Sequence, residues 1–348
     1  MTRFEFTERL ARRFDPRFCG GRPLVMCGVL ALASLFPCVG GLAGQTGAAH
    51  PSGRELTDEI GRKIQISQEV DRVVSLAPNL TEIVFALGDG NHLAGDTDSC
   101  DYPAEAAQKP HVGGPVNPSL EEIASLMPDL VLATKSINRR ETVTALDRIG
   151  LPVFVTDPHS VEQMIASVEH VGSALGTEKS AAAVAEDLRA RLSEIDRRLA
   201  GTAPRRVLFV VWTDPLISVG RGTFIADALR RAGGLSVVDT RAEWPHVSLE
   251  EIVRLQPEVL VFAGAHAGDT RRDIDALRTR PGWRRLSAIE HGNIVVLSDA
   301  INRPAPRMVD AIEQLARALH PEAFSSAAIA APSPNSNPIV EEACACTR

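Results

Sequence analysis

The chain has 348 residues and a formal net charge of -7, with 44% hydrophobic and 23% charged residues. This length accommodates two domains of roughly 100–200 residues each, and the composition is ordinary for a soluble globular protein. The acidic balance, without a concentrated basic face, speaks against nucleic acid as a partner.

Residues 1–50 have the composition of an export leader followed by a linker. An apolar run from Pro23 to Ala43 follows a basic stretch that contains Arg3, Arg9, Arg12, Arg13, Arg17 and Arg22. A basic region, an apolar region and a small-residue exit are the parts of a secretory signal. We therefore expect an exported protein, either periplasmic or anchored on the outer side of the cytoplasmic membrane. Cleavage, lipid attachment at Cys38 and retention as an anchor all stay open.

The segment 55–176 alternates short apolar strands with helices. A hairpin is predicted from Leu56 to Ile66, because apolar residues alternate there around an Ile-Gly pair. A buried strand follows at 72–76, and Asn79 with Glu82 forms a capping-box pattern that opens a helix. The continuing alternation predicts an α/β lobe built around a mainly parallel sheet.

A long helix is predicted from residue 178 to residue 200, with Thr177 as its N-cap and Gly201 just past its end. Its apolar residues recur every three or four positions and form one stripe, made by Val184, Leu188, Leu192, Ile195 and Leu199. At ~1.5 Å per residue such a helix spans ~35 Å. The segment 177–201 is therefore expected to connect two lobes.

The alternation of strands and helices resumes at Arg206, which predicts a second lobe over 202–320. Residues 321–348 are rich in Ala, Ser, Pro and Asn and predict a disordered tail. Only Cys100 lies in the body of the chain, so no disulfide framework is expected. Two tail cysteines, Cys344 and Cys346, do not complete a metal site by themselves.

A repeat relates the two predicted lobes. The segment 119–133, which begins Ser-Leu-Glu-Glu-Ile, matches 248–262 at a constant offset of 129 residues. Each copy predicts a capped helix, a break at proline and a buried strand. A period of this length indicates duplicated lobes, because solenoid repeats run ~20–50 residues. Two lobes leave a cleft between them, and domain interfaces are preferred ligand sites.

Several of these segments resemble the periplasmic cobalamin-binding proteins. The matching segments are 72–82, 101–103, the two Ser-Leu-Glu-Glu-Ile copies, Trp-Pro-His-Val-Ser at 244–248, Pro-Gly-Trp at 281–283 and 292–299. That family belongs to the helical-backbone class of ABC transporter solute-binding proteins, which also includes siderophore and haem binders. The resemblance covers about residues 55–320. It implies two α/β lobes, each with a mainly parallel central sheet flanked by helices, joined by one long rigid backbone helix.

The resemblance also implies a function, namely capture of cobalamin or a related corrinoid in the interlobe cleft and delivery to the membrane permease. Trp244 matches an aromatic ligand position of the family, and Trp212 lies beside another. The chain departs from the family at Ser99, Pro115, Thr134 and Val211, where relatives offer aromatic side chains. The candidate ligand-binding residues are Pro78, Asn79, Asp98, Ser99, Thr134, Trp212, Trp244, Asp299 and Arg303.

Residue chemistry supports these candidates and leaves plainer alternatives open. Tryptophan supplies a large flat face suited to a planar macrocycle, although both tryptophans are equally suited to packing between elements. A helix that begins near Pro78 would present free amides to a ligand or simply carry a cap. Asp299 and Arg303 either line the cleft or form a surface ion pair.

Glu121 and Glu250 occupy equivalent places in the repeat, each in the first turn of its helix. The resemblance implies that they dock on arginines of the permease transmembrane subunits. Their alternative role is to favour the helix dipole, an effect of ~0.3–1 kcal/mol.

No catalytic constellation is recognisable, so we expect no enzymatic activity, no metal site and no cofactor. Separately, we expect a monomer. His246, beside Trp244, either approaches a ligand's metal or is an ordinary surface histidine. Two rival functions remain. One is ferric-siderophore or haem binding, for which Tyr102 is the only tyrosine in the chain. The other is a metal-handling enzyme of chelatase-like fold.

Overall fold

The computed structural model describes residues 53–264 and 274–325, which belong to a compact unit that begins at Ala49. The expected leader and most of the expected tail lie outside the described residues. None of the helices described is long and apolar enough to cross a membrane.

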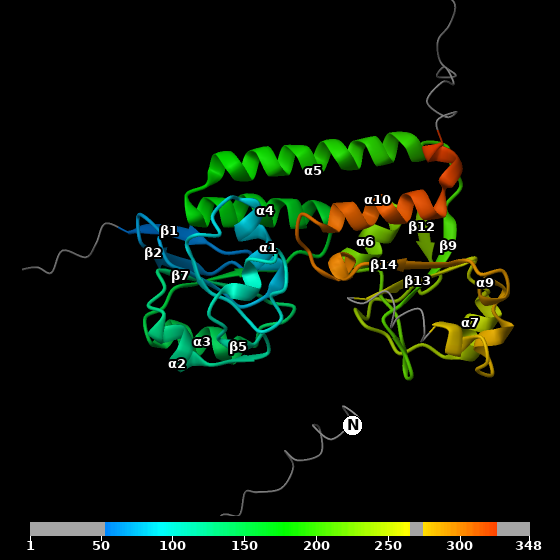
Figure 1. Cartoon of the computed structure of the whole chain (residues 1–348), viewed down its shortest axis with the longest axis horizontal. Coiled ribbons are helices and arrows are strands. Elements are labelled where there is room, and N and C mark those ends of the chain that lie inside the picture. The colour runs from blue at the N-terminus through cyan, green and yellow to red at the C-terminus, as the bar shows by residue number, and fades with distance from the viewer. Residues whose placement is uncertain (1–52, 265–273, 326–348) are drawn as a thin grey trace, which may run out of the picture. The chain divides into compact units, whose positions relative to one another are not determined.

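The first lobe is built on a four-stranded parallel sheet of order β4-β3-β7-β8 (Figure 1). Its strands are β3 (Val73–Ser75), β4 (Leu93–Gly95), β7 (Leu130–Thr134) and β8 (Val153–Thr156). The residues of β3, β7 and β8 are buried because helices cover both faces. One face carries α1 (Pro78–Ala86) and α4 (Val161–Leu175), and the other carries α2 (Leu120–Ser125) and α3 (Arg140–Arg148).

An antiparallel hairpin precedes this sheet, as predicted. It consists of β1 (Arg54–Thr57) and β2 (Lys63–Ile66), with Leu56 opposite Ile64. A short antiparallel pair, β5 (Gly113–Gly114) and β6 (Asn117–Pro118), follows the 3-10 turn at Ala106–Gln108.

The second lobe repeats the design, with a parallel sheet of order β12-β9-β13-β14. Its strands are β9 (Arg205–Val210), β12 (Gly234–Ser236), β13 (Val259–Ala263) and β14 (Ile294–Leu297). The helices are α6 (Phe224–Arg231) and α10 (Met308–Leu319) on one face, and α7 (Leu249–Leu255) and α9 (Ser287–Glu290) on the other. Short 3-10 turns lie at Trp283–Arg285, Asp299–Asn302 and Pro321–Phe324.

The predicted repeat is visible in three dimensions. Its first copy forms α2 and β7, and its second copy forms α7 and β13, which hold the third position of their sheets. Each copy also has a left-handed residue just before its proline, Met127 with φ 46° and Gln256 with φ 45°. The two lobes are therefore duplicated down to the turn that ends the repeated helix.

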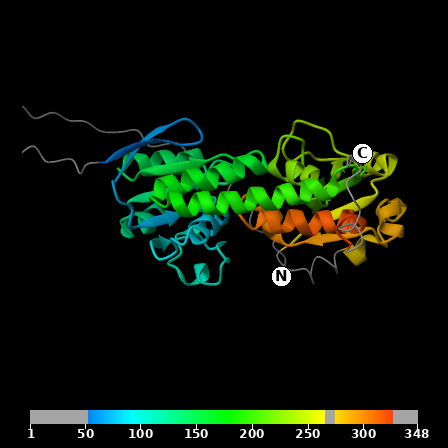
Figure 2. The same cartoon turned by 90° about the horizontal axis from the view of Figure 1, so that it is seen from above.

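The predicted long helix is α5 (Glu178–Leu199), which runs alongside α4 and α10 (Figures 1 and 2). Its buried side belongs to a hydrophobic cluster shared by both lobes, which includes Leu188 and Ile195. Close packing against α4 needs a glycine, because a Cβ at Gly172 would lie 2.3 Å from the Cβ of Ala181.

The first residues of the segment expected to be a disordered tail are ordered against the second lobe and α5. Residues 321–324 form a 3-10 turn, and the Phe324 ring lies under the guanidinium groups of Arg198 and Arg317, 5.3 and 4.9 Å from the ring centroid. The sequence pattern was too polar to indicate this contact, because a single phenylalanine carries it.

Candidate functional site

The two lobes are joined by an ion-pair network, here called the interlobe clasp. It consists of Glu82, Asp101 and Tyr102 from the first lobe and Asp299, Arg303 and Arg307 from the second. These residues follow or lie near the carboxyl ends of parallel strands, the edge at which open α/β sheets present ligands.

Glu82 is the centre of the clasp. Its side chain is only 2% exposed and accepts hydrogen bonds from Arg303 Nη1 at 3.0 Å and from Arg307 Nε and Nη2 at 2.9 and 2.6 Å. The Arg307 guanidinium also stacks on the Tyr102 ring, 3.7 Å from its centroid. A buried carboxylate is thus held by two cations of the opposite lobe.

The remaining carboxylates of the clasp neutralise Arg303. Asp101 lies 2.6 Å and Asp299 2.5 Å from its guanidinium nitrogens. The hydrogen bond from Arg303 lowers the pKa of Asp101. Burial opposes the charge on Arg303, but the hydrogen bond to Asp101 and the charge of Asp299 raise its pKa overall. Asp299 and Arg303 thus form an ion pair that is largely buried, and their lining of the cleft stays a prediction.

The predicted capping box of Asn79 and Glu82 is wrong. The N-cap of α1 is Ala77, which makes no side-chain capping bond, and Pro78 occupies the first turn. The helix thus begins two residues earlier than expected, as proline favours its first position. Glu82 faces the arginines of the other lobe, and Asn79 is buried, its Oδ1 lacking a hydrogen-bond partner among the described residues.

The other predicted ligand residues of the first lobe divide by exposure. Asp98 and Ser99 are exposed on the loop after β4. Thr134 is 0% exposed and Pro78 is buried, so neither reaches a ligand in this conformation. The Oδ1 of the buried Asn138 accepts a hydrogen bond from the Thr134 backbone N–H at 2.7 Å.

The two predicted tryptophans of the second lobe are both exposed. Trp212 lies on β10 (Trp212–Thr213) and is 61% exposed, and Trp244 is 46% exposed. Trp212 lines a cavity of about 450 Å³ at the ends of β9 and β13, together with Val211, Phe262, Leu277 and Arg280. Large exposed apolar side chains gathered at a cavity are typical of a binding surface.

The first lobe has exposed aliphatic side chains in addition to the exposed Tyr102. Val116, between β5 and β6, is 44% exposed, and Ile137, after β7, is 37% exposed. Sequence reasoning missed both, since only their exposure in the folded chain distinguishes them from core residues. The described residues contain no group of three or more His, Cys, Asp or Glu side chains able to hold a metal ion.

A buried acid, Asp96, precedes the loop of residues 98–102 and should make stability depend on pH. Asp96 is 0% exposed, its Oδ1 lies 2.8 Å from His111 Nδ1, and burial raises its pKa from 3.8 to about 6. The folded state therefore binds this proton more tightly than the unfolded chain. The resulting stabilisation is present below pH ~4 and is lost as pH rises through ~6.

Replacing Asp96 by asparagine should remove this dependence. Relative to the variant, the wild type should lose up to about 3 kcal/mol of unfolding free energy between pH 4 and 7. Urea unfolding at several pH values measures both curves. Parallel curves would show that Asp96 titrates alike in the folded and unfolded chains.

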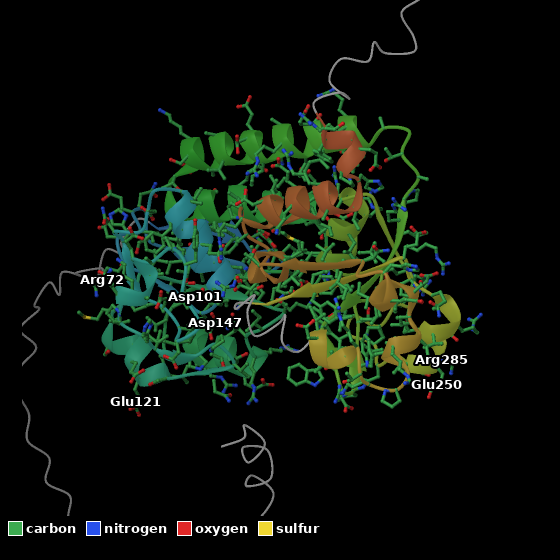
Figure 3. All side chains as sticks on the ribbon, turned by 45° about the vertical axis from the view of Figure 1, so that its right-hand side comes forward. Arg72, Asp101, Glu121, Asp147, Glu250 and Arg285 are labelled. Atoms are coloured by element: carbon green, nitrogen blue, oxygen red, sulfur yellow. The ribbon has the colours of Figure 1, made fainter. Side chains whose placement is uncertain are left out.

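The two predicted docking glutamates lie on equivalent helices. Ser119 caps α2 and Ser248 caps α7, each accepting from a backbone N–H three residues later. Glu121 and Glu250 are exposed in the first turns, while Ile123 and Ile252 are fully buried as expected. Figure 3 shows the two glutamates at the ends of their lobes opposite α5. A hydrogen bond from Ser248 Oγ lowers the pKa of Glu250.

Two duplicated parallel-sheet lobes, a shared helix and an apolar surface at the strand ends define a two-lobed solute-binding protein. A family model described as periplasmic binding protein matches residues 73–300. The chain belongs to this periplasmic binding protein family.

Individual relatives narrow the class. The uncharacterized ABC transporter substrate-binding lipoprotein YvrC of Bacillus subtilis is 29% identical over 278 residues, 77% of this chain and 86% of the relative. The structure of the periplasmic vitamin B12 binding protein BtuF of Vibrio cholerae superposes with TM-score 0.62 at 26% identity, covering 74% of this chain and 98% of that one. The structure of the periplasmic heme-binding protein RhuT from Roseiflexus sp. RS-1, in its apo form, superposes with TM-score 0.65 at 28% identity. The match covers 73% of this chain and 99% of that one.

The chain is thus a substrate-binding protein of an ABC transporter, of the class that includes vitamin B12 and haem binders. This class implies a small-molecule ligand and a permease partner.

Proposed function

We propose that the protein captures cobalamin or a related corrinoid between its lobes, without chemical conversion, and delivers it to an ABC permease. The observation that carries this proposal is the pair of exposed tryptophans, Trp212 and Trp244, on the second lobe. A planar macrocycle buries large flat apolar faces, and indoles match such faces with little loss of side-chain entropy.

The charge of the site favours a corrinoid over haem or a ferric siderophore. Haem propionates and anionic siderophores need unpaired cations, because a buried anion without a partner is costly. Arg303 and Arg307 are occupied by the carboxylates of the clasp, and Arg280, at the cavity, lies 3.7 Å from Asp214. The amide side chains of a corrinoid need hydrogen-bonding groups instead, and the exposed Asp98 and Ser99 supply them.

Tyr102 is poorly placed to bind the iron of a haem. Its ring is stacked against the Arg307 guanidinium, and it is the only tyrosine in the chain. We further propose that the mature protein works as a monomer outside the cytoplasmic membrane, either periplasmic or anchored there. The basic and apolar leader, together with the lipoprotein and periplasmic relatives, supports this location.

We also propose that Glu121 and Glu250 are the docking points on the permease. Both are exposed carboxylates in matching positions of the repeat, which suits a partner with two similar halves. Complementary charge at such points steers encounter and fixes orientation.

Calorimetric titration with cyanocobalamin should give saturable binding of one ligand per chain. Replacing Trp244 by alanine should weaken binding by about 2–4 kcal/mol, the loss expected for an aromatic residue that carries binding energy. Trp212→Ala should have a smaller effect on affinity. The indole Nε1–H of Trp212 already donates to the Asp214 carbonyl at 2.8 Å and is not free to bind the ligand.

The matched control also removes one tryptophan, but from the core instead of the surface. Trp283 is 3% exposed in the core, so Trp283→Phe should leave affinity unchanged. Saturable heat with a ferric siderophore or haemin, and none with cyanocobalamin or cobinamide, would reassign the ligand within the same class.

A further inference from the structure

A small antiparallel ribbon in the second lobe places one histidine beside the exposed tryptophans. Strand β10 pairs with β11 (Leu216–Ile217), and Trp212 lies opposite Ile217. A third segment joins on the far side, where Ile217 lies opposite His246. The backbone N–H groups of Ser218 and Val247 donate across this second pair, at 3.1 and 3.0 Å.

The pairing fixes the face from which the imidazole projects. Directly opposed residues of antiparallel strands project from the same face of the sheet. Ile217 and His246 form a non-hydrogen-bonded pair, the type in which the two opposed side chains lie closer together. Trp212, Ile217 and His246 therefore form one row, and Trp244 lies two residues before the histidine. The exposed imidazole thus shares a face of the ribbon with Trp212, one strand beyond Ile217, and both tryptophans are exposed.

His246 also differs from the other described histidines in its hydrogen bonding. In each of the other six a ring nitrogen has a protein partner: His92 with Asp89, His111 with Asp96, His159 with Asp157, His170 with Glu59, His291 with the Ser287 carbonyl and His320 with the Gly233 carbonyl. Within the described part of the chain, the His246 ring has none. A neutral imidazole with an unused nitrogen is the commonest protein ligand for a metal.

We infer that His246 coordinates the metal at the centre of the bound macrocycle through a ring nitrogen. This inference rests on the proposed function, because the tryptophans must hold the macrocycle against the ribbon. The step is a ligand exchange at cobalt(III): the imidazole lone pair forms the Co–N bond, and an axial water leaves with its own electron pair. No electron or proton transfer is needed. The site therefore selects corrinoids that have an exchangeable axial position.

The test uses cobalt(III) cobinamide in its aquo form, a corrinoid whose axial waters exchange. Added to the wild-type protein, it should show the visible absorption shift that accompanies replacement of axial water by imidazole nitrogen. His246→Ala should bind at least tenfold more weakly and without the shift. The spectral shift reports the Co–N bond itself, so a purely structural role for His246 does not produce it.

Two controls complete the design. His159→Ala removes an exposed histidine that pairs with Asp157, and it should keep the shift. Dicyanocobinamide, whose axial positions are both occupied, should bind wild type and His246→Ala equally.

The outcomes separate this inference from the proposed function. Wild-type binding without a shift, or a shift that persists in His246→Ala, overturns the role of His246 and leaves corrinoid capture standing. Failure of the wild type to bind either cobinamide form or cyanocobalamin overturns corrinoid capture itself.

Discussion

Replacing Glu121 and Glu250 together by arginine should abolish ligand uptake by cells and leave ligand affinity almost unchanged. Both side chains are exposed in the first turns of α2 and α7 and are not among the candidate ligand-binding residues, so we expect the ligand site to be unaltered. Reversal would set positive charge against the arginines expected on the permease, a repulsion of several kcal/mol. Uptake of labelled cyanocobalamin, with calorimetry and a melting curve on the purified variant, measures the three quantities.

The matched control is Glu178→Arg with Glu186→Arg on α5. Both residues are exposed, Glu178 lies in the first turn of its helix, and the change in net charge is the same. The control should transport normally. If the docking variant also transports normally and loses only ~1 kcal/mol of stability per site, then Glu121 and Glu250 serve the helix dipole alone.

Replacing Glu82 by alanine should lower the free energy of unfolding by about 3–5 kcal/mol, the usual cost of removing one partner from a buried ion pair. The variant leaves Arg307 without its carboxylate, whereas Arg303 keeps Asp101 and Asp299. Denaturant unfolding measures the loss. Asp187→Asn, which removes an exposed carboxylate of α5, should stay within about 0.5 kcal/mol of wild type.

Scattering tests whether the clasp or α5 holds the lobes. Curves of free and ligand-bound wild type should nearly superimpose, because a long helix resists hinge bending. If Glu82→Ala behaves in the same way, α5 suffices to fix the lobes. In the unfolding experiment, a free energy of unfolding for Glu82→Ala equal to that of the wild type would show that the cost of desolvating the charges of the clasp cancels their attraction.

Local and repeated features of the fold could be predicted from the sequence. The hairpin, the parallel lobes and α5 follow from alternation, helical periodicity and capping residues, which act over a few positions. Ser119 and Ser248 were recognisable because one pattern occurs twice. The exposure of Glu121 and Glu250 followed from the burial expected for Ile123 and Ile252.

The clasp could not be predicted in the same way. Arg307 lies 225 residues from Glu82 in the chain, and a capping pattern offered a sufficient local explanation for the glutamate. Thr134 illustrates a second limit. Its position at the end of β7 was foreseeable, but its complete burial was not, and neither were the hydrogen bonds by which Asn138 joins it to the carbonyls of Leu76 and Pro115.

The hydrophobic cluster shared by the lobes bears on how such a duplicated chain folds. It runs from Val73 of the first sheet through Leu188 of α5 to Leu319 of α10 without interruption. A single lobe cut from this chain would expose the apolar sides of α4 or α10 to water, at about 25 cal/mol per Å². Each half is therefore a structural repeat but not an independent folding unit, and the two halves should form and melt cooperatively as one.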